Sequence, residues 1–293
     1  GNTGTLYVQI NNTKVTYAGD PENLTLGVWQ AWNIDLSSMN VQNVTKLQIG
    51  VDGGSAAGMI LIDDIKLYGG GGEVITPVDP GTANLAGAWS LDEGNGTSTS
   101  DASGNGLTGT IVGALWDQGP QGSALLFAEM DYVETAYAGI TGTGPRTYTA
   151  WIKTVEADRT IMSCGLNTTG NKWRIRLDAT GGLRVEVNGG YNYGQAFLAD
   201  DEWHHTAVVL DDDGTPDVDE TLLYVDGLPE TTRAIQSTAI DTDATGEFRI
   251  GLATYDTVGF IGSIDDVRVY DRALSDGEVR SLAGKTTPVD KPF

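Results

Sequence analysis

The chain has 293 residues, and its 17 basic and 40 acidic side chains give a formal net charge of −23. This charge repels phosphate backbones and anionic lipid, which argues against nucleic-acid and membrane-surface partners. No apolar stretch is long enough for a membrane-inserted helix, and the single cysteine, Cys164, excludes an intrachain disulfide. Forty glycines, eleven tyrosines and seven tryptophans, without extended helical periodicity, predict an all-β protein.

The N-terminal segment, residues 1–68, shows a small set of strand-like patterns. Apolar and polar residues alternate at 5–10, 14–17, 29–35, 44–51 and 59–68. Five strands are few for a closed β-sandwich, so we expect a partial or small jelly-roll module here. Four glycines at 69–72 and a proline-spaced stretch up to residue 81 predict a linker.

The longer segment, residues 82–284, is predicted to be a second β-sandwich. Strand signals recur about every ten residues from Ala86 to Tyr270, separated by Gly, Asn and Asp. One short helix follows, because Ser275 and Glu278 form a capping-box pattern and Gly284 can end the helix. Residues 285–293 are expected to be a tail or a further linker, with the natural chain continuing beyond them.

The two segments end on nearly the same sequence, which is IDDIKLY at 62–68 and IDDVRVY at 264–270. This echo predicts two sandwich modules that close on the same kind of strand. Neighbouring residues along a strand point to opposite faces, so only one of Asp265 and Asp266 can face the interior side of the sheet.

Six stretches of the longer segment occur in a family-like order: GAWSLDEG at 87–94, DASGNGLTG at 101–109, YTAWIK at 148–153, EWHHTA at 202–207, LYVDG at 223–227 and GSIDDVRVYDRALS at 262–275. With them, the segment resembles the laminin-G-like domains of the concanavalin A-like lectin/glucanase superfamily, of the type common in bacterial surface proteins. WQAWNIDL at 29–36, GVDGG at 50–54 and the strand at 62–68 resemble the C-terminal half of a jelly-roll, carbohydrate-binding-like module.

The resemblance implies a structural calcium ion that joins the chain ends through a carboxylate on the last strand. Asp265 matches that carboxylate by position, with Asp266 expected to be exposed. The predicted metal ligands are Asp265, Asp92, Glu93, Asp101 and Asn105, with Asp63 as the counterpart in the first segment. The alternative is that these side chains cap turns and bind backbone amides.

Aromatic and polar side chains suited to a sugar occur in two adjacent predicted strands and a glycine-rich turn, at 173–176 and 186–195. Pyranose rings stack on aromatic faces, while amides and charged groups bind the hydroxyls. The predicted ligand-binding residues are Trp173, Arg174, Arg176, Asn188, Tyr191, Tyr193 and Gln195. The alternative is that the two tyrosines plug the rim of the sandwich.

No catalytic residue is predicted. Glycoside hydrolysis needs two carboxylates across the scissile bond, and the laminarinase-like relatives carry theirs as Glu-x-Asp-x-(x)-Glu on one strand. Here Glu156 and Asp158 are followed by no third acid. The only two histidines, His204 and His205, are adjacent in a strand-like segment and face opposite ways, so they form no relay.

The sequence therefore predicts a non-catalytic recognition or adhesion protein, secreted or on a cell surface, that binds a glycan or glycoprotein and is stabilised by calcium. Folds of this type host many roles, so two alternatives are kept. One is a self-assembling structural protein of a cell surface, matrix or filament. The other is a binding appendage of a larger secreted glycoside hydrolase.

Overall fold

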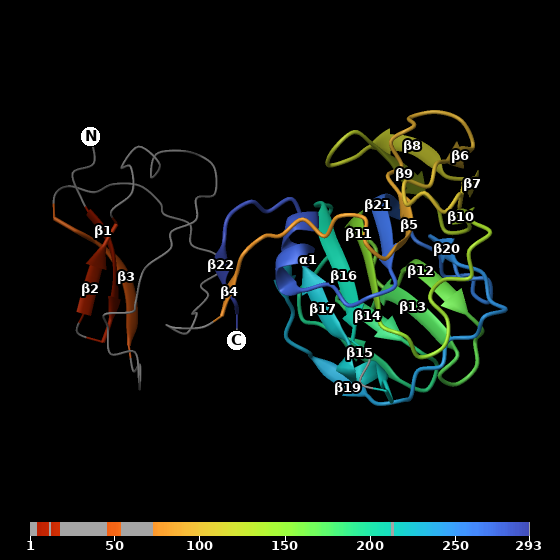
Figure 1. Cartoon of the computed structure of the whole chain (residues 1–293). Helices are drawn as coiled ribbons and strands as arrows, with labels where there is room; N and C mark the ends of the chain where they lie inside the picture. The colour runs from red at the N-terminus through yellow and green to blue at the C-terminus, as the bar shows by residue number, and fades with distance from the viewer. Residues whose placement is uncertain (1–4, 12, 18–45, 54–72, 212–213, 293) are drawn as a thin grey trace. The chain divides into compact units, whose positions relative to one another are not determined.

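The computed structural model describes residues 5–11, 13–17, 46–53, 73–211 and 214–292. The chain divides into two compact units, Gly1–Glu73 and Val74–Phe293 (Figure 1). Among the described residues, no helix combines the length and apolar character needed to cross a bilayer.

The described part of the first unit is a three-stranded antiparallel sheet in the order β2 (Thr13–Thr16), β1 (Thr5–Ile10) and β3 (Leu47–Asp52). Tyr7 packs across Gly50, where a Cβ atom would lie 2.6 Å from the tyrosine oxygen. The strands predicted near 5–10, 14–17 and 44–51 are present. The strands predicted at 29–35 and 59–68, with Asp63, lie outside the described residues.

The second unit is a sandwich of two large antiparallel sheets. One has nine strands in the order β19 (Ala234–Gln236), β15 (Tyr191–Tyr193), β14 (Leu183–Glu186), β13 (Lys172–Leu177), β12 (Thr160–Gly165), β20 (Arg249–Ile250), β10 (Tyr132–Glu134), β7 (Gly109–Val112) and β6 (Ser98–Thr99).

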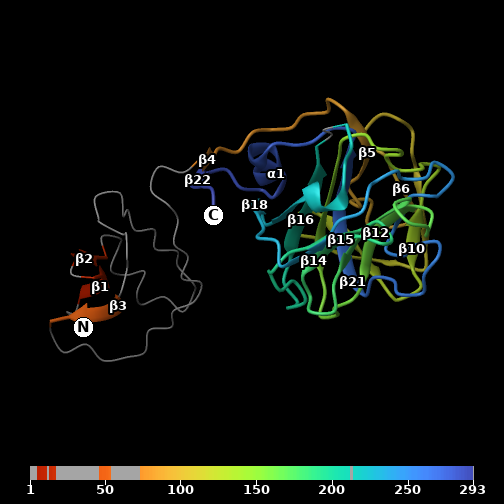
Figure 2. The same cartoon turned by 90° about the horizontal axis from the view of Figure 1, so that it is seen from below.

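The other sheet has eight strands, in the order β18 (Leu228–Pro229), β17 (Leu222–Val225), β16 (His204–Leu210), β11 (Arg146–Lys153), β21 (Gly262–Tyr270), β9 (Ser123–Phe127) and β8 (Leu115–Gln118), with β5 (Leu85–Trp89) pairing beside β9 on β21. Figure 2 shows the two layers from a second direction.

The main core lies between the two sheets because each strand turns its apolar side chains inward. Trp173 and Ile175 of β13 meet Val208 and Leu210 of β16 in one buried cluster. Trp89, which is completely buried, extends this cluster. The sequence-predicted all-β sandwich is therefore confirmed.

A second, smaller core lies between the eight-stranded sheet and the helix α1 (Asp276–Leu282), and Val279 of the helix belongs to it. The predicted capping box is present: the Glu278 amide donates to Ser275 Oγ at 3.4 Å, and the Ser275 amide donates to Glu278 Oε2 at 2.8 Å. A 3-10 turn, η2 (Val218–Glu220), is the other helical element described.

The predicted linker and tail meet each other in the second unit. β4 (Val74–Ile75) pairs antiparallel with β22 (Val289–Asp290). The chain leaving β4 packs on α1, because the Val78 amide donates to the Gly277 carbonyl at 2.9 Å, and a Cβ on Gly277 would lie 2.2 Å from the Thr76 carbonyl oxygen. Two-residue strands carry no periodicity, so sequence patterns alone do not distinguish them from a linker.

Candidate functional site

The outer face of β13, β14 and β15 carries most of the predicted ligand-binding residues. In β13, Arg174 and Arg176 point outward and alternate with inward-pointing residues. Trp173 is one of the latter: it is 0% exposed and its ring centroid lies 5.9 Å from that of Tyr148 in the core. The prediction that Trp173 binds the ligand is therefore wrong, because strand alternation places Trp173 on the opposite side of the sheet from Arg174.

We call the outward-facing group on these three strands the charged face; its members are Lys172, Arg174, Arg176, Arg184, Glu186, Tyr191 and Tyr193. The register explains why they gather. Arg174 lies opposite Glu186, Arg176 opposite Arg184, and Arg184 opposite Tyr193.

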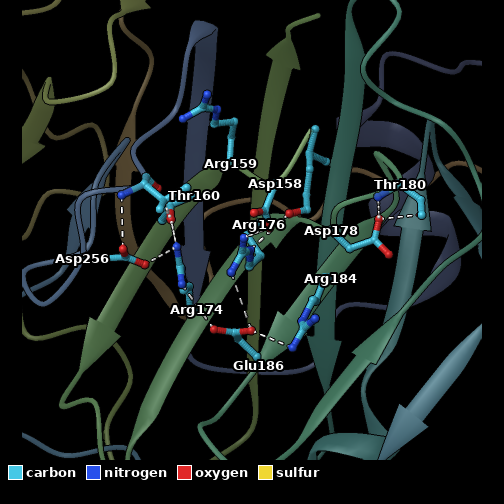
Figure 3. Close-up of polar contacts among 12 residues, drawn as sticks. Asp158, Arg159, Thr160, Arg174, Arg176, Asp178, Thr180, Arg184, Glu186 and Asp256 are labelled. Carbon is cyan, nitrogen blue, oxygen red and sulfur yellow. Dashed lines mark hydrogen bonds and ion pairs between the residues drawn. The ribbon is translucent and has the colours of Figure 1, made fainter. Parts of the chain in front are cut away.

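Glu186 is the centre of the charged face (Figure 3). Its carboxylate lies 2.6 Å from Lys172 Nζ and 2.9 Å from Arg184 Nη2. Arg174 Nη1 and Arg176 Nη1 lie 3.4 and 4.0 Å from it. Burial by itself would raise the pKa of Glu186, but the hydrogen bond from Lys172 and the surrounding cations hold that pKa below its ordinary value. Glu186 therefore stays ionised.

Two further carboxylates bind the arginines from the edge of the face. Arg174 Nη2 pairs with Asp256 at 2.6 Å, and its Nε donates to Thr160 Oγ1 at 2.9 Å. Arg176 pairs with Asp158, which has a left-handed backbone conformation at φ 63°. Burial alone would raise the pKa of Asp256, but Arg174 and the backbone amides that follow it lower that pKa. The buried guanidinium groups are consequently fixed in position.

The tyrosines flank this network on β15. The ring centroids of Tyr191 and Tyr193 lie 5.5 Å apart at an interplanar angle of 32°. The guanidinium carbon of Arg184 lies 4.5 Å from the Tyr191 centroid and 5.9 Å from that of Tyr193. Both tyrosines are half-buried, so part of each ring is open to solvent.

The remaining two predicted residues flank β15 in the chain and do not join its charged neighbours. Asn188 donates its side-chain amide to the Asn167 carbonyl at 2.9 Å, and Gln195 is an exposed residue whose backbone amide binds Glu230 at 3.0 Å. Three residues of the charged face were not among the predicted ligand-binding residues: Lys172, Arg184 and Glu186. The available signal was the alternation of charged and apolar residues in 172–177 and 183–186.

Of the predicted metal ligands, Asp265 and Asp92 lie close together. β21 has a register irregularity opposite Thr149 and Trp151, and Asp266 is left-handed there at φ 44°. This bulge buries Asp265, which is only 2% exposed, and leaves Asp266 half-buried beside Arg268.

The turn between β8 and β9 brings further oxygen atoms toward Asp265. A Cβ on Gly119 would lie 2.6 Å from both Asp265 Oδ2 and the Ser123 carbonyl oxygen, and Asp92 Oδ1 accepts the Ser123 amide at 3.0 Å. Burial raises the pKa of Asp265 to about 8, and the negative charges of Asp266 and Asp92 add to the rise. A carboxylate that ionises here needs a compensating cation.

The other predicted metal ligands lie away from Asp265 or already accept or donate hydrogen bonds within the protein. Asp101 accepts the amides of Ala88, Ser103 and Leu107 at 3.0, 2.9 and 3.0 Å. Asn105 donates to the carbonyls at the start of β5. This turn therefore caps the free edge of β5, which is the alternative role foreseen for it.

Glu93 binds the Ser100 amide at 2.6 Å through Oε1, while its Oε2 is buried without a partner. No cluster of three or more His, Cys, Asp or Glu residues arranged to hold a metal occurs in the described residues. The structure thus offers Asp265 and Asp92 as a carboxylate pair and does not assemble the whole predicted set.

The matching family model is that of the concanavalin A-like lectin/glucanases superfamily, and it covers residues 127–280. The chain belongs to this superfamily. No curated protein matches it by sequence.

Two solved structures share the fold at low identity. Domain 4 of AbnA, a GH43 extracellular arabinanase from Geobacillus stearothermophilus solved with arabinotriose, is 22% identical, with 68% of this chain and 98% of that domain covered at a TM-score of 0.53. The binding domain of Paraclostridial mosquitocidal protein 1 is 14% identical, with 69% and 52% covered at a TM-score of 0.53.

Proposed function

We propose that the second unit is a non-catalytic glycan-binding module of a secreted or cell-surface recognition protein, and that the charged face is its binding surface. The observation that carries this proposal is the pair of half-exposed tyrosines beside the fixed network around Glu186. The lectin/glucanase-type fold supports it. So does the likeness to an arabinanase domain that was solved with a trisaccharide.

The chemistry of the charged face suits a sugar. Aromatic rings bind the C–H faces of a pyranose or furanose, and fixed ionic groups bind its hydroxyls. Arg174 and Arg176 are held by carboxylates before any ligand arrives. Because these side chains are already ordered, binding costs little additional conformational entropy.

The same electrostatics favour binding over cleavage. A glycosidase needs a carboxylic acid with a raised pKa to protonate the leaving group. Glu186 and Asp256 have lowered pKa values because cations surround them. Asp265 has a raised pKa but belongs to β21 in the other sheet.

We include a structural calcium ion in the proposal. Calcium prefers oxygen ligands, and Asp265 Oδ2, the Asp92 carboxylate and the Ser123 carbonyl supply them around one turn. Bound there, the ion would offset the buried charge of Asp265 and tie β21 to the turn between β8 and β9. The other two roles predicted from the sequence, self-assembly and service as an appendage of a hydrolase, stay predictions.

A glycan array probed with the calcium-loaded protein tests the proposal, followed by calorimetry on the sugars that bind. Tyr191→Ala is expected to weaken binding about tenfold or more, the usual effect of losing one stacked ring. The matched control is Tyr132→Ala on β10, a half-buried tyrosine in the same sheet that also lies beside an arginine. A blank array from folded protein, or release of shorter sugars from the bound ones, would contradict the proposal.

A further inference from the structure

The cations of the charged face share too few carboxylates. Four of them lie within 4.0 Å of the single carboxylate of Glu186. Arg174 and Arg176 each have a second carboxylate, from Asp256 and Asp158 respectively. In the described part of the chain this leaves four cations against three carboxylates, an excess of one positive charge in a protein whose net charge is −23.

Arg184, like Lys172, has less compensation than Arg174 and Arg176, which each have a second carboxylate. Within the described residues its one carboxylate partner is Glu186, at 2.9 Å, which also serves the three other cations. Crowding of like charge is visible next to it: burial, and then repulsion from Arg174, lowers the pKa of Arg176. A buried or half-buried cation without full compensation favours an added anion.

Arg184 is also the most exposed of the four cations, since the Lys172 side chain is only 9% exposed. The Arg184 side chain is 26% exposed, compared with 5% for Arg174 and 12% for Arg176. It lies over Tyr191 and near Tyr193, the rings assigned above to sugar stacking. An acidic group held by Arg184 would therefore belong to a ring that contacts these tyrosines.

We propose that the saccharide recognised by this face is acidic, with a uronate carboxylate or a sulfate held by the guanidinium group of Arg184. This inference rests on the proposed glycan-binding function. The planar fork of arginine matches both anions, and charge-assisted hydrogen bonds of this kind are stronger than those to neutral hydroxyls. The net charge of the chain opposes a long polyanion, but at physiological ionic strength charges beyond about 8 Å are screened. A short acidic saccharide, or an acidic residue within a neutral chain, fits best.

A second arginine on the same sheet provides the control. Arg249 on β20 lies 4.3 Å from the Tyr132 centroid, much as Arg184 lies over Tyr191. Arg249, however, pairs with both Glu134 and Glu247, at 3.4 and 3.0 Å. Arg249 therefore also lies beside a tyrosine ring, but two carboxylates balance its positive charge, so it should attract no anion.

The test uses an array of short acidic glycans paired with neutral forms of the same backbone: uronate oligosaccharides with their methyl esters, and sulfated oligosaccharides with their desulfated forms. Titration calorimetry on the full chain then follows with the best pair. The acidic form is expected to bind about tenfold more tightly, the effect of one charge-assisted hydrogen bond. Arg184→Met should abolish that preference, so that the acidic and neutral forms bind with equal affinity, while Arg249→Met should leave the preference intact.

The possible outcomes separate the two proposals. Tyr191-dependent binding of neutral sugars, with no gain from the acidic group, would overturn the acidic-ligand inference and leave the glycan-binding function standing. Preference for the acidic form that survives Arg184→Met would also overturn it. Binding of no glycan would refute both. The carboxylate and sulfate arms identify which anion Arg184 holds.

Discussion

Replacing Asp265 by Asn should remove a pH dependence from the stability of the metal-free protein. The carboxyl of Asp265 has a folded-state pKa of about 8, well above that of an ordinary Asp. At pH values between the ordinary Asp pKa and about 8, the folded state therefore binds more protons than the unfolded state. The free energy of unfolding falls as pH rises through this range. The asparagine oxygen can still accept the Asp266 amide, which Asp265 Oδ1 accepts at 2.8 Å.

The size of the effect follows from the interval between the two pKa values. Each pH unit within this interval lowers the free energy of unfolding by at most about 1.4 kcal/mol, so the largest possible decrease from pH 5 to pH 7 is roughly 3 kcal/mol. The neighbouring Asp92 is exposed, and solvent there screens part of the charge. We expect the difference between the two proteins to change by about 2 kcal/mol over this range.

Urea unfolding in EDTA at pH 5, 6 and 7 measures this difference, because subtracting the variant cancels groups common to both proteins. Repeating the titrations in calcium should stabilise the wild type, increasingly so as pH rises, and leave Asp265→Asn unaffected. Parallel pH profiles for the two proteins in EDTA would refute the electrostatic reasoning. Equal calcium responses would refute the metal site.

Two further predictions concern residues outside the binding face. Asp101→Ala should lower the free energy of unfolding by about 2–3 kcal/mol, because three backbone amides lose their acceptor. The loss should be the same in EDTA and in calcium, and a calcium-dependent loss would restore Asp101 as a ligand. His204 Nδ1 lies 2.9 Å from Asp226, which raises the pKa of His204. The ion pair therefore stabilises the fold fully below pH 6.5, and this stabilisation is lost as pH rises through the folded-state pKa of His204. In urea titrations the free energy of unfolding of the wild type should exceed that of His204→Gln by at most about 1 kcal/mol at pH 6, and this difference should shrink by pH 9.

Local patterns predicted the strand-rich character of the second unit and its one short α-helix. The family-like stretches at 148–153 and 262–275 coincide with β11 and β21, and the Ser275–Glu278 capping pattern predicted α1. The pairing of β4 with β22 was not foreseen, because strands of two residues carry no periodic signal. The placement of Trp173 was wrong because its aromatic ring was weighed more than the alternation of the strand that carries it.

The sequence by itself determined the fold class, the superfamily and the side chains that alternate along each strand, because these depend on residue order along one strand or turn. Only the tertiary structure decided how strands align with each other. Register made Glu186 the shared partner of four cations and set Arg184 opposite Tyr193, from where its guanidinium group reaches the Tyr191 ring. The bulge in β21 buried Asp265 beside Asp92, although the two residues are far apart in the chain. The pKa values and ion pairs of these groups depend on neighbours that are remote in sequence, so no local sequence pattern predicts them.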